Sequence, residues 1–316
     1  YSGGASCPSL LLEPSRTNVW EYSEYLEYSF ASISGITTTQ NTTETLSPEG
    51  LYNATKLEGV EFWSLRDFIA GTDTGTWTIS CYIKAVNASS NNTFRLSVGG
   101  NNYSNNLTAT SEWQRFDLTI TNGGATAAGI LRDTSANDAD LYIYGMQIEE
   151  ASYSSSYIPN HSGGGSVTRE LDHCFTSSNS VLEEISATYF LEVTPIQITS
   201  NNLLEVRANG STDNRILLQT NSSGTLRVLV RAQGSSVLDQ NIGSAVSSNT
   251  KVKIALKYTD QTNISVFVDG VKEIDSDLVI DFSPELNGLD LEGSATANND
   301  SLKQHQFIFF PTALSD

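Results

Sequence analysis

The stretch TWTISCYIK, residues 76–84, decides the fold class of this chain. Its side chains alternate between apolar and polar with a period of two, the pattern of a β-strand that buries one face and exposes the other. Cys81 lies on the apolar face of the run and is expected to be a small core residue. The stretch therefore predicts one strand of a half-buried sheet.

Comparable runs recur along the whole chain, separated by clusters of Gly, Asn, Ser and Asp that are typical of turns. They lie at residues 93–98, 114–121, 140–149, 187–193, 215–219, 225–232, 252–258, 263–269 and 306–310. Amphipathic stretches with a 3.6-residue period are scarce. Many short strands at this spacing predict an all-β chain built as a sandwich or barrel.

The chain has 316 residues, about twice the usual domain length, so two domains are expected. A proline and a glycine run at residues 159–166, PNHSGGGS, interrupt the strand pattern between the two halves. We therefore predict one domain over 1–162 and a second over 163–316. Each half is long enough for its own two-sheet core.

The composition argues against several classes of partner. The formal net charge is −19, and Lys and Arg together number only 17. Phosphate binding needs clustered cations, so nucleic acid is not an expected partner. No apolar run has the length needed to cross a bilayer, so membrane insertion is not expected. The acidic surface suits an extracellular setting and is compatible with divalent cations such as calcium.

A series of short motifs occurs in the first half in a fixed order. They are LLLEPSRTN (10–18), EYSE (21–24), SPEG (47–50), WTISCYIK (77–84), EWQR (112–115), LYIYGMQIEE (141–150), YIP (157–159) and VTR (167–169). In this order they resemble a domain of phage-tail and bacterial surface proteins, over about residues 1–174. The resemblance implies a jelly-roll β-sandwich like that of many carbohydrate-binding modules, although a fold alone does not establish sugar binding.

The second half resembles a concanavalin A-like or laminin G-like domain. The resemblance rests on KVKIALKY (251–258), ISVFVDG (264–270) and FIFFPTALSD (307–316). It implies a second β-sandwich, with Asp269 and Gly270 forming the tight turn of a hairpin. The expected architecture is thus a jelly-roll followed by a concanavalin A-like sandwich.

The sequence offers little for catalysis. Its histidines, His161, His173 and His305, are scattered, and neither a Gly-x-Ser-x-Gly nor a His-Glu-x-x-His motif occurs. Asp290 and Glu292 lack the Glu-x-Asp-x-x-Glu spacing that some glycan-cleaving concanavalin A-like enzymes use. We therefore expect a chain that is not an enzyme.

Sugar binding needs an exposed aromatic face for the pyranose ring and planar polar groups for its hydroxyls. Trp63, with Arg66 and Asp67 close by, has this mixture, and Tyr103 lies in a polar loop. Trp20, which follows the RTN motif, is a further candidate. For Trp63 and Trp20 the alternative is a place in the hydrophobic core.

Two other tryptophans, Trp77 and Trp113, are assigned to regular strands of the resembled domain, where burial is the expected state. We therefore do not count either of them among the predicted glycan contacts.

The oxygen-rich string at residues 133–140 is a candidate calcium site, because calcium prefers hard oxygen ligands. Its carboxylates are Asp133, Asp138 and Asp140. The resemblance to jelly-roll modules, which commonly carry a structural calcium between their first and last strands, adds Glu13 as a partner. The alternative is an exposed acidic turn.

Cys7, Cys81 and Cys174 are the only cysteines, which fits neither a disulfide-dense scaffold nor a zinc site. Cys7 and Cys174 flank the first domain and are a candidate disulfide pair.

These features together predict a non-catalytic segment of a phage tail fibre or of another extracellular surface protein that binds glycans on a host surface. One alternative is a purely structural role as a spacer or assembly domain, in which the chain forms a homo-oligomer such as a trimer. Another is the accessory region of a secreted polysaccharide-degrading enzyme. The expected location is a virion tail or the cell surface.

Overall fold

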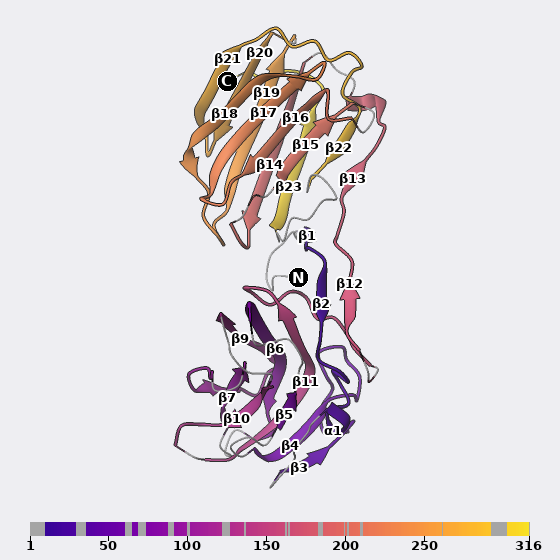
Figure 1. Ribbon diagram of the computed structural model, residues 1–316, viewed down its shortest axis with the longest axis vertical. Coiled ribbons are helices and arrows are strands. Elements are labelled where there is room, and N and C mark those ends of the chain that lie inside the picture. The colour runs from indigo at the N-terminus through magenta and orange to yellow at the C-terminus, as the bar shows by residue number, and fades with distance from the viewer. Residues whose placement is uncertain are drawn as a thin grey trace. The chain divides into compact units, whose positions relative to one another are not determined.

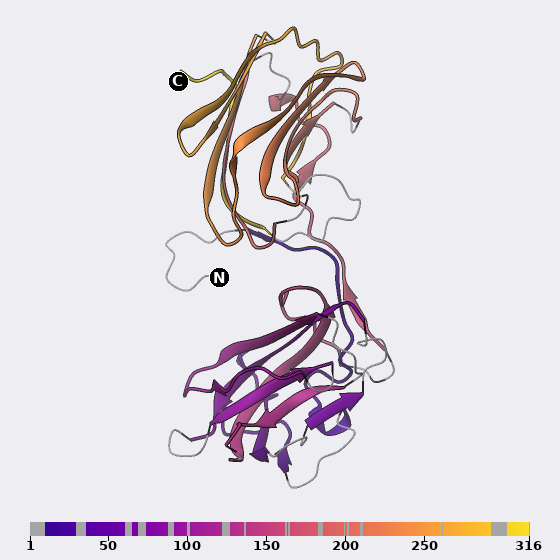
Figure 2. The ribbon, with the colours of Figure 1, turned by 60° about the vertical axis from the view of Figure 1, so that its left-hand side comes forward.

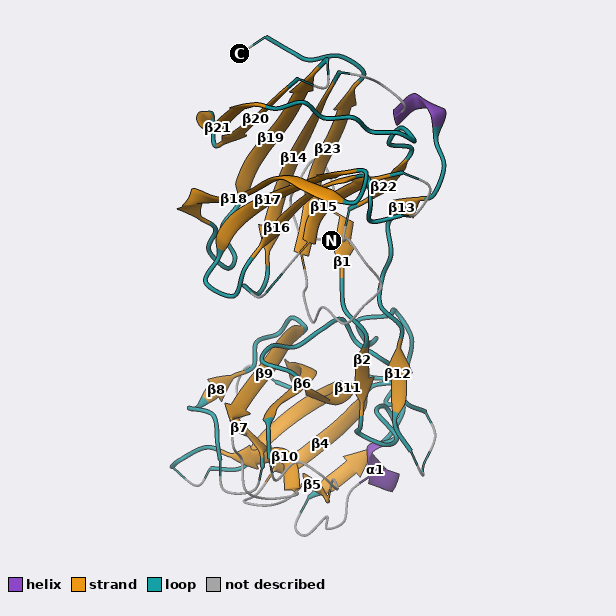
Figure 3. Cartoon of the chain, turned by 45° about the horizontal axis from the view of Figure 1, so that its top comes forward, coloured by secondary structure: helices purple, strands orange, loops and turns teal. Residues whose placement is uncertain are grey.

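The structure is a computed structural model that describes residues 10–29, 36–60, 65–68, 74–87, 92–99, 102–121, 127–135, 137–161, 163, 165–182, 186–198, 200, 202–208, 211–260, 262–291 and 302–315. Strands dominate; the helical elements described are α1 (Leu26–Ser29) and a 3₁₀ turn (Ser180–Leu182) (Figure 3). The chain divides into an N-terminal unit, Arg16–Glu170, and a C-terminal unit, Leu171–Asp316 with Tyr1–Ser15. The predicted all-β class is confirmed. Neither helical element among these residues is long enough to span a membrane.

The N-terminal unit is a sandwich of two antiparallel sheets with a small two-stranded ribbon (Figure 1). The first sheet has the order β3 (Thr37–Thr39), β4 (Thr55–Val60), β11 (Ala139–Glu150), β6 (Thr76–Ala85) and β9 (Gln114–Thr121). The second has the order β5 (Leu65–Phe68), β10 (Ala127–Arg132), β7 (Thr93–Val98) and β8 (Leu107–Thr108). The ribbon pairs β2 (Arg16–Asn18) with β12 (Val167–Arg169).

The core of this unit lies between its two sheets. Strand β6 contributes Ile79, Cys81 and Ile83, all fully buried. From the other sheet, the buried ring of Phe94 meets Phe116 of β9 edge-on, with ring centroids 5.1 Å apart. The apolar face that the alternation at residues 76–84 predicts is therefore the face that closes the sandwich.

The C-terminal unit contains two six-stranded antiparallel sheets, seen edge-on as two facing layers in Figure 2. One has the order β1 (Leu10–Leu12), β23 (Leu302–Phe310), β14 (Ala187–Pro195), β19 (Val252–Thr259), β20 (Asn263–Val268) and β21 (Val271–Asp277). The other has the order β13 (Phe175–Thr176), β22 (Gly288–Asp290), β15 (Asn202–Arg207), β16 (Arg215–Thr220), β17 (Thr225–Ala232) and β18 (Ser235–Ala245). A single apolar cluster between them includes Tyr189, Leu191, Val206, Leu218 and Ile254.

Strand β1 joins the C-terminal unit, which differs from the predicted division at 162/163. Leu10 pairs with Gln304 and Leu12 with Leu302, and the side chain of Leu12 lies in the core of that unit. At the other junction, β12 pairs with β2, so residues up to Glu170 belong to the N-terminal unit. The difference arises because hydrophobic alternation locates a strand but does not say which sheet edge a short strand joins.

The hairpin of β20 and β21 turns at Asp269 and Gly270, as the sequence predicts. Both residues have positive φ, 49° and 85°. Positive φ at both central positions is the requirement of a two-residue type I′ turn, which explains the Asp-Gly pair. This hairpin lies at one edge of its sheet.

Candidate functional site

Asn18, the last residue of the RTN motif, is a fully buried hydrogen-bonding centre. Its Nδ2 donates to Ser23 Oγ (2.9 Å) and to the backbone carbonyl of Ile158 (2.8 Å). Its Oδ1 accepts from the backbone N–H groups of Trp20 (2.9 Å) and Ile148 (3.1 Å). The hydrogen bonds of this one side chain thus connect the segment after β2, strand β11 and the YIP motif.

Glu24, from the EYSE motif, is a second buried centre. Its Oε1 accepts from the hydroxyls of Tyr144 (3.2 Å) and Tyr157 (3.1 Å), and its Oε2 accepts from Asn53 Nδ2 (3.2 Å). Burial, and then the charge of Glu24, raise the pKa of Tyr157 far above its ordinary value. The Tyr157 hydroxyl therefore stays protonated and remains a donor to the carboxylate.

Glu149 is the third centre and is fully buried. Its Oε1 accepts from the backbone N–H of Ser155 (2.7 Å) and from Gln147 Nε2 (2.9 Å), and its Oε2 accepts from Ser155 Oγ (2.8 Å). Arg16 Nε lies 3.8 Å from Oε2. Arg16 in turn donates to the hydroxyl of Tyr153 at 3.2 Å.

The motifs that carry the resemblance in the N-terminal unit are therefore largely interior structural contacts. Trp20 belongs to the same interior, with an exposed fraction of 0%. The prediction that Trp20 contacts a glycan is wrong, because the chain after Asn18 turns into the core and no face of the indole ring reaches a ligand.

The other predicted glycan contacts stay predictions. Trp63 lies outside the described residues. Arg66 and Asp67 lie on β5, which pairs with β10, but the structure does not describe their side chains. Tyr103 is half-buried, and the guanidinium of Arg95 lies 5.1 Å from its ring centroid. A cation thus already occupies one face of the Tyr103 ring.

The acidic loop at residues 133–140 is organised by its own hydrogen bonds. Asp133 Oδ1 accepts from the backbone N–H groups of Ser135 (2.9 Å) and Asn137 (3.0 Å), and Oδ2 accepts from Asn137 Nδ2 (3.2 Å). Burial alone would raise the pKa of Asp133, but these hydrogen bonds outweigh it and the pKa is lowered. The carboxylate therefore serves as a turn-forming acceptor.

The remaining predicted calcium ligands do not gather around Asp133. Asp140 Oδ1 accepts a hydrogen bond from the backbone N–H of Gly59 (3.0 Å). Asp138 Oδ1 lies 3.9 Å from Arg132 Nη1. Glu13 belongs to the C-terminal unit, not to the unit that holds the loop. Within the described residues no group of three or more His, Cys, Asp or Glu is placed to hold a metal. Calcium binding stays a prediction.

The cysteines divide between the two units. Cys81 is fully buried, and burial raises the pKa of its thiol to about 12, in keeping with the core role that the sequence predicts. Cys174 is half-buried and Cys7 lies outside the described residues, so the candidate disulfide between them is untested.

An open depression of about 550 Å³ lies on the N-terminal unit between the loop at residues 43–52 and the start of β9. Two aromatic side chains line it: Trp113, which is half-buried, and Tyr52, which is 56% exposed. Trp113 Nε1 donates to the carbonyl of Leu46 at 2.7 Å, which fixes the plane of the indole. Lys84, also in the lining, donates to Thr45 Oγ1 at 3.0 Å. Aromatic and polar surfaces therefore meet in one open site.

The loop at residues 43–52 is held in shape by the SPEG motif. Ser47 Oγ accepts from the backbone N–H of Glu49 (3.2 Å), and the Ser47 carbonyl accepts from Gly50 N–H (2.9 Å). Gly50 has a φ of 82°, a conformation that residues with a Cβ rarely adopt. The depression therefore has a preformed wall.

Glu44 anchors the same loop to the sheet. Its carboxylate accepts from the hydroxyl of Tyr142 on β11 (2.7 Å) and from Lys56 Nζ on β4 (3.1 Å). The hydrogen bond from Tyr142, followed by that from Lys56, lowers the pKa of Glu44. Burial, and then the bond to Glu44, raise the pKa of Tyr142 to about 12. Glu44 is therefore an ionised acceptor throughout the neutral range.

We expect this anchor to weaken in acid. Because the pKa of Glu44 is lowered by folding, its contribution is present above the ordinary glutamate pKa of 4.5 and is lost as the pH falls through the lowered value. The indole N–H resonance of Trp113 should hold its NMR position from neutral pH to about pH 5 and move below about pH 4. Glu44→Gln should remove that movement. An unchanged acid transition in Glu44→Gln would assign it to other groups.

Trp113 is the residue that sequence reasoning missed. It was expected to be a buried strand residue, but it precedes β9 by one position and its side chain lies at the loop. The signal in the sequence is its place after Ser111 and Glu112, where a turn ends and the alternation of β9 has not yet begun.

Comparison with known proteins gives a likeness of fold. No family model and no curated protein matches the chain. Among solved structures, a heptameric SAP-like pentraxin from Limulus polyphemus aligns with a TM-score of 0.33 and 11% identity over 42% of this chain and 66% of that chain. The CBM40 of the Ruminococcus gnavus IT-sialidase, bound to α2,3-sialyllactose, gives 0.38 and 15% over 46% and 92%. The galectin LEC-6 of Caenorhabditis elegans gives 0.33 and 14% over 44% and 90%. With TM-scores below 0.5, this likeness does not indicate a ligand for the present chain.

Proposed function

We propose that this chain is a non-catalytic, glycan-recognising segment of an extracellular surface or fibre protein, and that the Trp113 depression contacts the sugar. The observation that carries the proposal is the half-buried indole of Trp113, which lines the depression and is held by its bond to Leu46, beside the exposed ring of Tyr52. Sugar rings present apolar C–H faces that stack on such aromatic surfaces.

The polar lining supplies partners for the hydroxyl groups of the same sugar. Glu44 offers carboxylate oxygens that accept hydrogen bonds, and Lys84 offers an ammonium that donates them. The exposed Thr43 adds a hydroxyl that does both. Because the loop is preformed, binding costs little ordering of the protein.

Recognition fits this site better than hydrolysis. A glycosidase needs a carboxylic acid whose raised pKa keeps it protonated for the leaving group. The pKa of Glu44 is lowered instead, so its carboxylate is ionised at neutral pH. The buried carboxylates Glu24 and Glu149 are engaged in interior hydrogen bonds. More specifically, we propose that the parent protein is a phage tail fibre and that the ligand is a glycan on a host surface.

Trp113→Ala should weaken binding of the intact chain to its glycan by roughly 30-fold, because an aromatic residue that dominates a site contributes about 2 kcal/mol or more. The glycan is first selected on a glycan array with the unaltered chain, and binding is then measured by calorimetry. Trp113→Phe, which keeps a ring but loses the bond to Leu46, should lie in between.

The matched control is Tyr28→Ala, since Tyr28 is a 71% exposed aromatic in the same unit and outside the depression. It should bind like the unaltered chain. Failure to find any ligand on the array, or unchanged affinity in a folded Trp113→Ala chain, counts against the proposal.

A further inference from the structure

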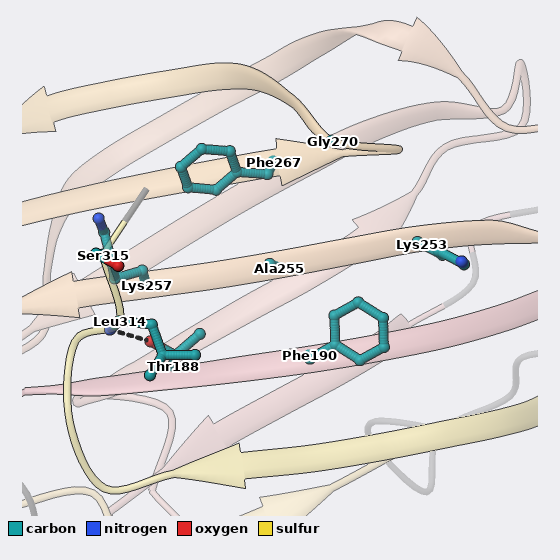
Figure 4. A pocket seen from close by; sticks show the side chains of 9 residues that line it. All are labelled: Thr188, Phe190, Lys253, Ala255, Lys257, Phe267, Gly270, Leu314 and Ser315. Atoms are coloured by element: carbon teal, nitrogen blue, oxygen red, sulfur yellow. Dashed lines mark hydrogen bonds between the residues drawn. The ribbon is translucent and has the colours of Figure 1, made fainter.

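The outer face of one sheet in the C-terminal unit carries an apolar groove of about 440 Å³ (Figure 4). Phe190 on β14 pairs with Ala255 on β19, and Ala255 pairs with Phe267 on β20. The three side chains therefore form one row across the sheet. The small Ala255 lies between two aromatic rings, which hollows the face at that point.

Two lysines border this hollow along β19. Lys253 and Lys257 lie two residues to either side of Ala255, so all three point to the same face. The side chain of Lys253 is 58% exposed, with its ammonium 3.8 Å from Glu192 Oε2, and the ammonium of Lys257 lies 5.8 Å from the centroid of the Phe267 ring. In a chain of net charge −19, five of the seven lysines fall within residues 251–303. Strand β19 thus presents an outward Lys–Ala–Lys triplet.

The last residue of β21 and the extended segment that follows it present the complementary triplet. Asp277, Val279 and Asp281 point outward, and Val279, with 87% exposed, is the most exposed large hydrophobic side chain in the described part of the chain. Between them, Leu278 packs against the core and Ile280 is buried. The segment is therefore held in place. Its outward side chains are exposed, although Asp277 Oδ1 accepts a hydrogen bond from Asn263 Nδ2 (3.0 Å) and Asp281 Oδ2 accepts one from Gln233 Nε2 (2.6 Å), and the segment does not cover the groove of its own chain.

The two triplets match in spacing and in charge. In both triplets, successive outward side chains are two residues apart on extended backbone. Their Cα atoms are therefore separated by about 6.6–6.8 Å along the chain. Val279 would fill the hollow over Ala255 between the two rings. The flanking aspartates would then face Lys253 and Lys257.

We infer that the groove docks residues 277–281 of a second copy of this chain. The apolar centre gives the contact its affinity, and the charged rim fixes its register. Because the groove and the segment are different surfaces, two copies can dock reciprocally as a closed two-fold dimer, whereas repetition of a one-way contact produces a ring or a filament. This inference is independent of the glycan proposal.

Sedimentation of the intact chain over a range of concentrations tests the contact. The unaltered chain should exceed the monomer mass of 34.2 kDa as its concentration rises. Val279→Arg should weaken association by roughly 10-fold or more, since it puts a cation between two lysines. Val271→Arg, at a 60% exposed valine of β21, is the matched control and should associate normally.

A pair of charge reversals makes the test specific. One chain carries Lys253→Glu and Lys257→Glu, and the other carries Asp277→Lys and Asp281→Lys. Each should stay monomeric alone, and an equimolar mixture should associate, because every groove then finds a segment of opposite charge. The inference is overturned if the unaltered chain stays monomeric, if folded Val279→Arg associates normally, or if the mixture gains nothing over its components.

Discussion

Glu149→Ala should lower the free energy of unfolding of the N-terminal unit by about 3–5 kcal/mol, the usual cost of breaking a buried ion pair from one side. Arg16, whose side chain is 6% exposed, would lose its buried counter-charge. The backbone N–H and hydroxyl of Ser155 and the amide of Gln147 would lose their acceptor in the interior. In a unit of this size such a loss lowers the melting temperature by roughly 10 °C.

Differential scanning calorimetry of the intact chain measures this effect. Glu150→Ala is the matched control, because Glu150 is the next residue of the same strand and is exposed. Its melting temperature should stay within about 2 °C of the unaltered chain. If Glu149→Ala melts no lower than Glu150→Ala, the buried network does not stabilise the unit as described.

Asn18→Asp is the second large expected effect, about 3 kcal/mol, although the two side chains have the same shape. The Nδ2 group that donates to Ser23 and to the carbonyl of Ile158 would become a carboxylate oxygen. That oxygen would face the Ile158 carbonyl as a second acceptor, in a site with no exposure to water. Asn18→Ala should cost less, since it removes the bonds without burying a charge.

The stabilities of these variants are compared by urea unfolding, monitored by tryptophan fluorescence. The buried Trp20 is a reporter close to the substituted residue. Asn106→Asp is the control, because Asn106 makes its hydrogen bonds to Thr134 at an exposed site. Equal midpoints for Asn18→Asp and Asn106→Asp would contradict the role assigned to Asn18.

The sequence predicts individual strands better than their assembly. Alternation at residues 76–84 and the Asp269–Gly270 turn lead directly to β6 and to the hairpin of β20 and β21. Strand β1 shows the limit. Its three leucines predict burial, but the pairing of Leu12 with Leu302 depends on two segments far apart in sequence, which no local pattern encodes.

The candidate site was harder to predict for a related reason. The RTN and EYSE motifs could be recognised in the sequence, but only the contacts of Asn18 and Glu24 assign them to the interior. Trp113 could not be separated from a strand tryptophan, because its exposure depends on where the loop at residues 43–52 lies. Exposure of an aromatic ring is a tertiary property.

The two proposals reinforce each other in function. Association through the groove in the C-terminal unit would place several Trp113 depressions on one particle. Single sugar contacts at open sites are weak, and simultaneous contacts raise the overall affinity by orders of magnitude. A multimeric chain would therefore hold a glycan-coated surface much more firmly than a monomer.

Whether Trp113 contacts the sugar is decided by NMR titration of the isotope-labelled intact chain with the glycan chosen on the array. We predict that the largest shifts occur at the indole N–H of Trp113 and at the backbone amides of residues 43–52. Shifts concentrated elsewhere, with the Trp113 indole unmoved at saturation, would contradict the proposed site.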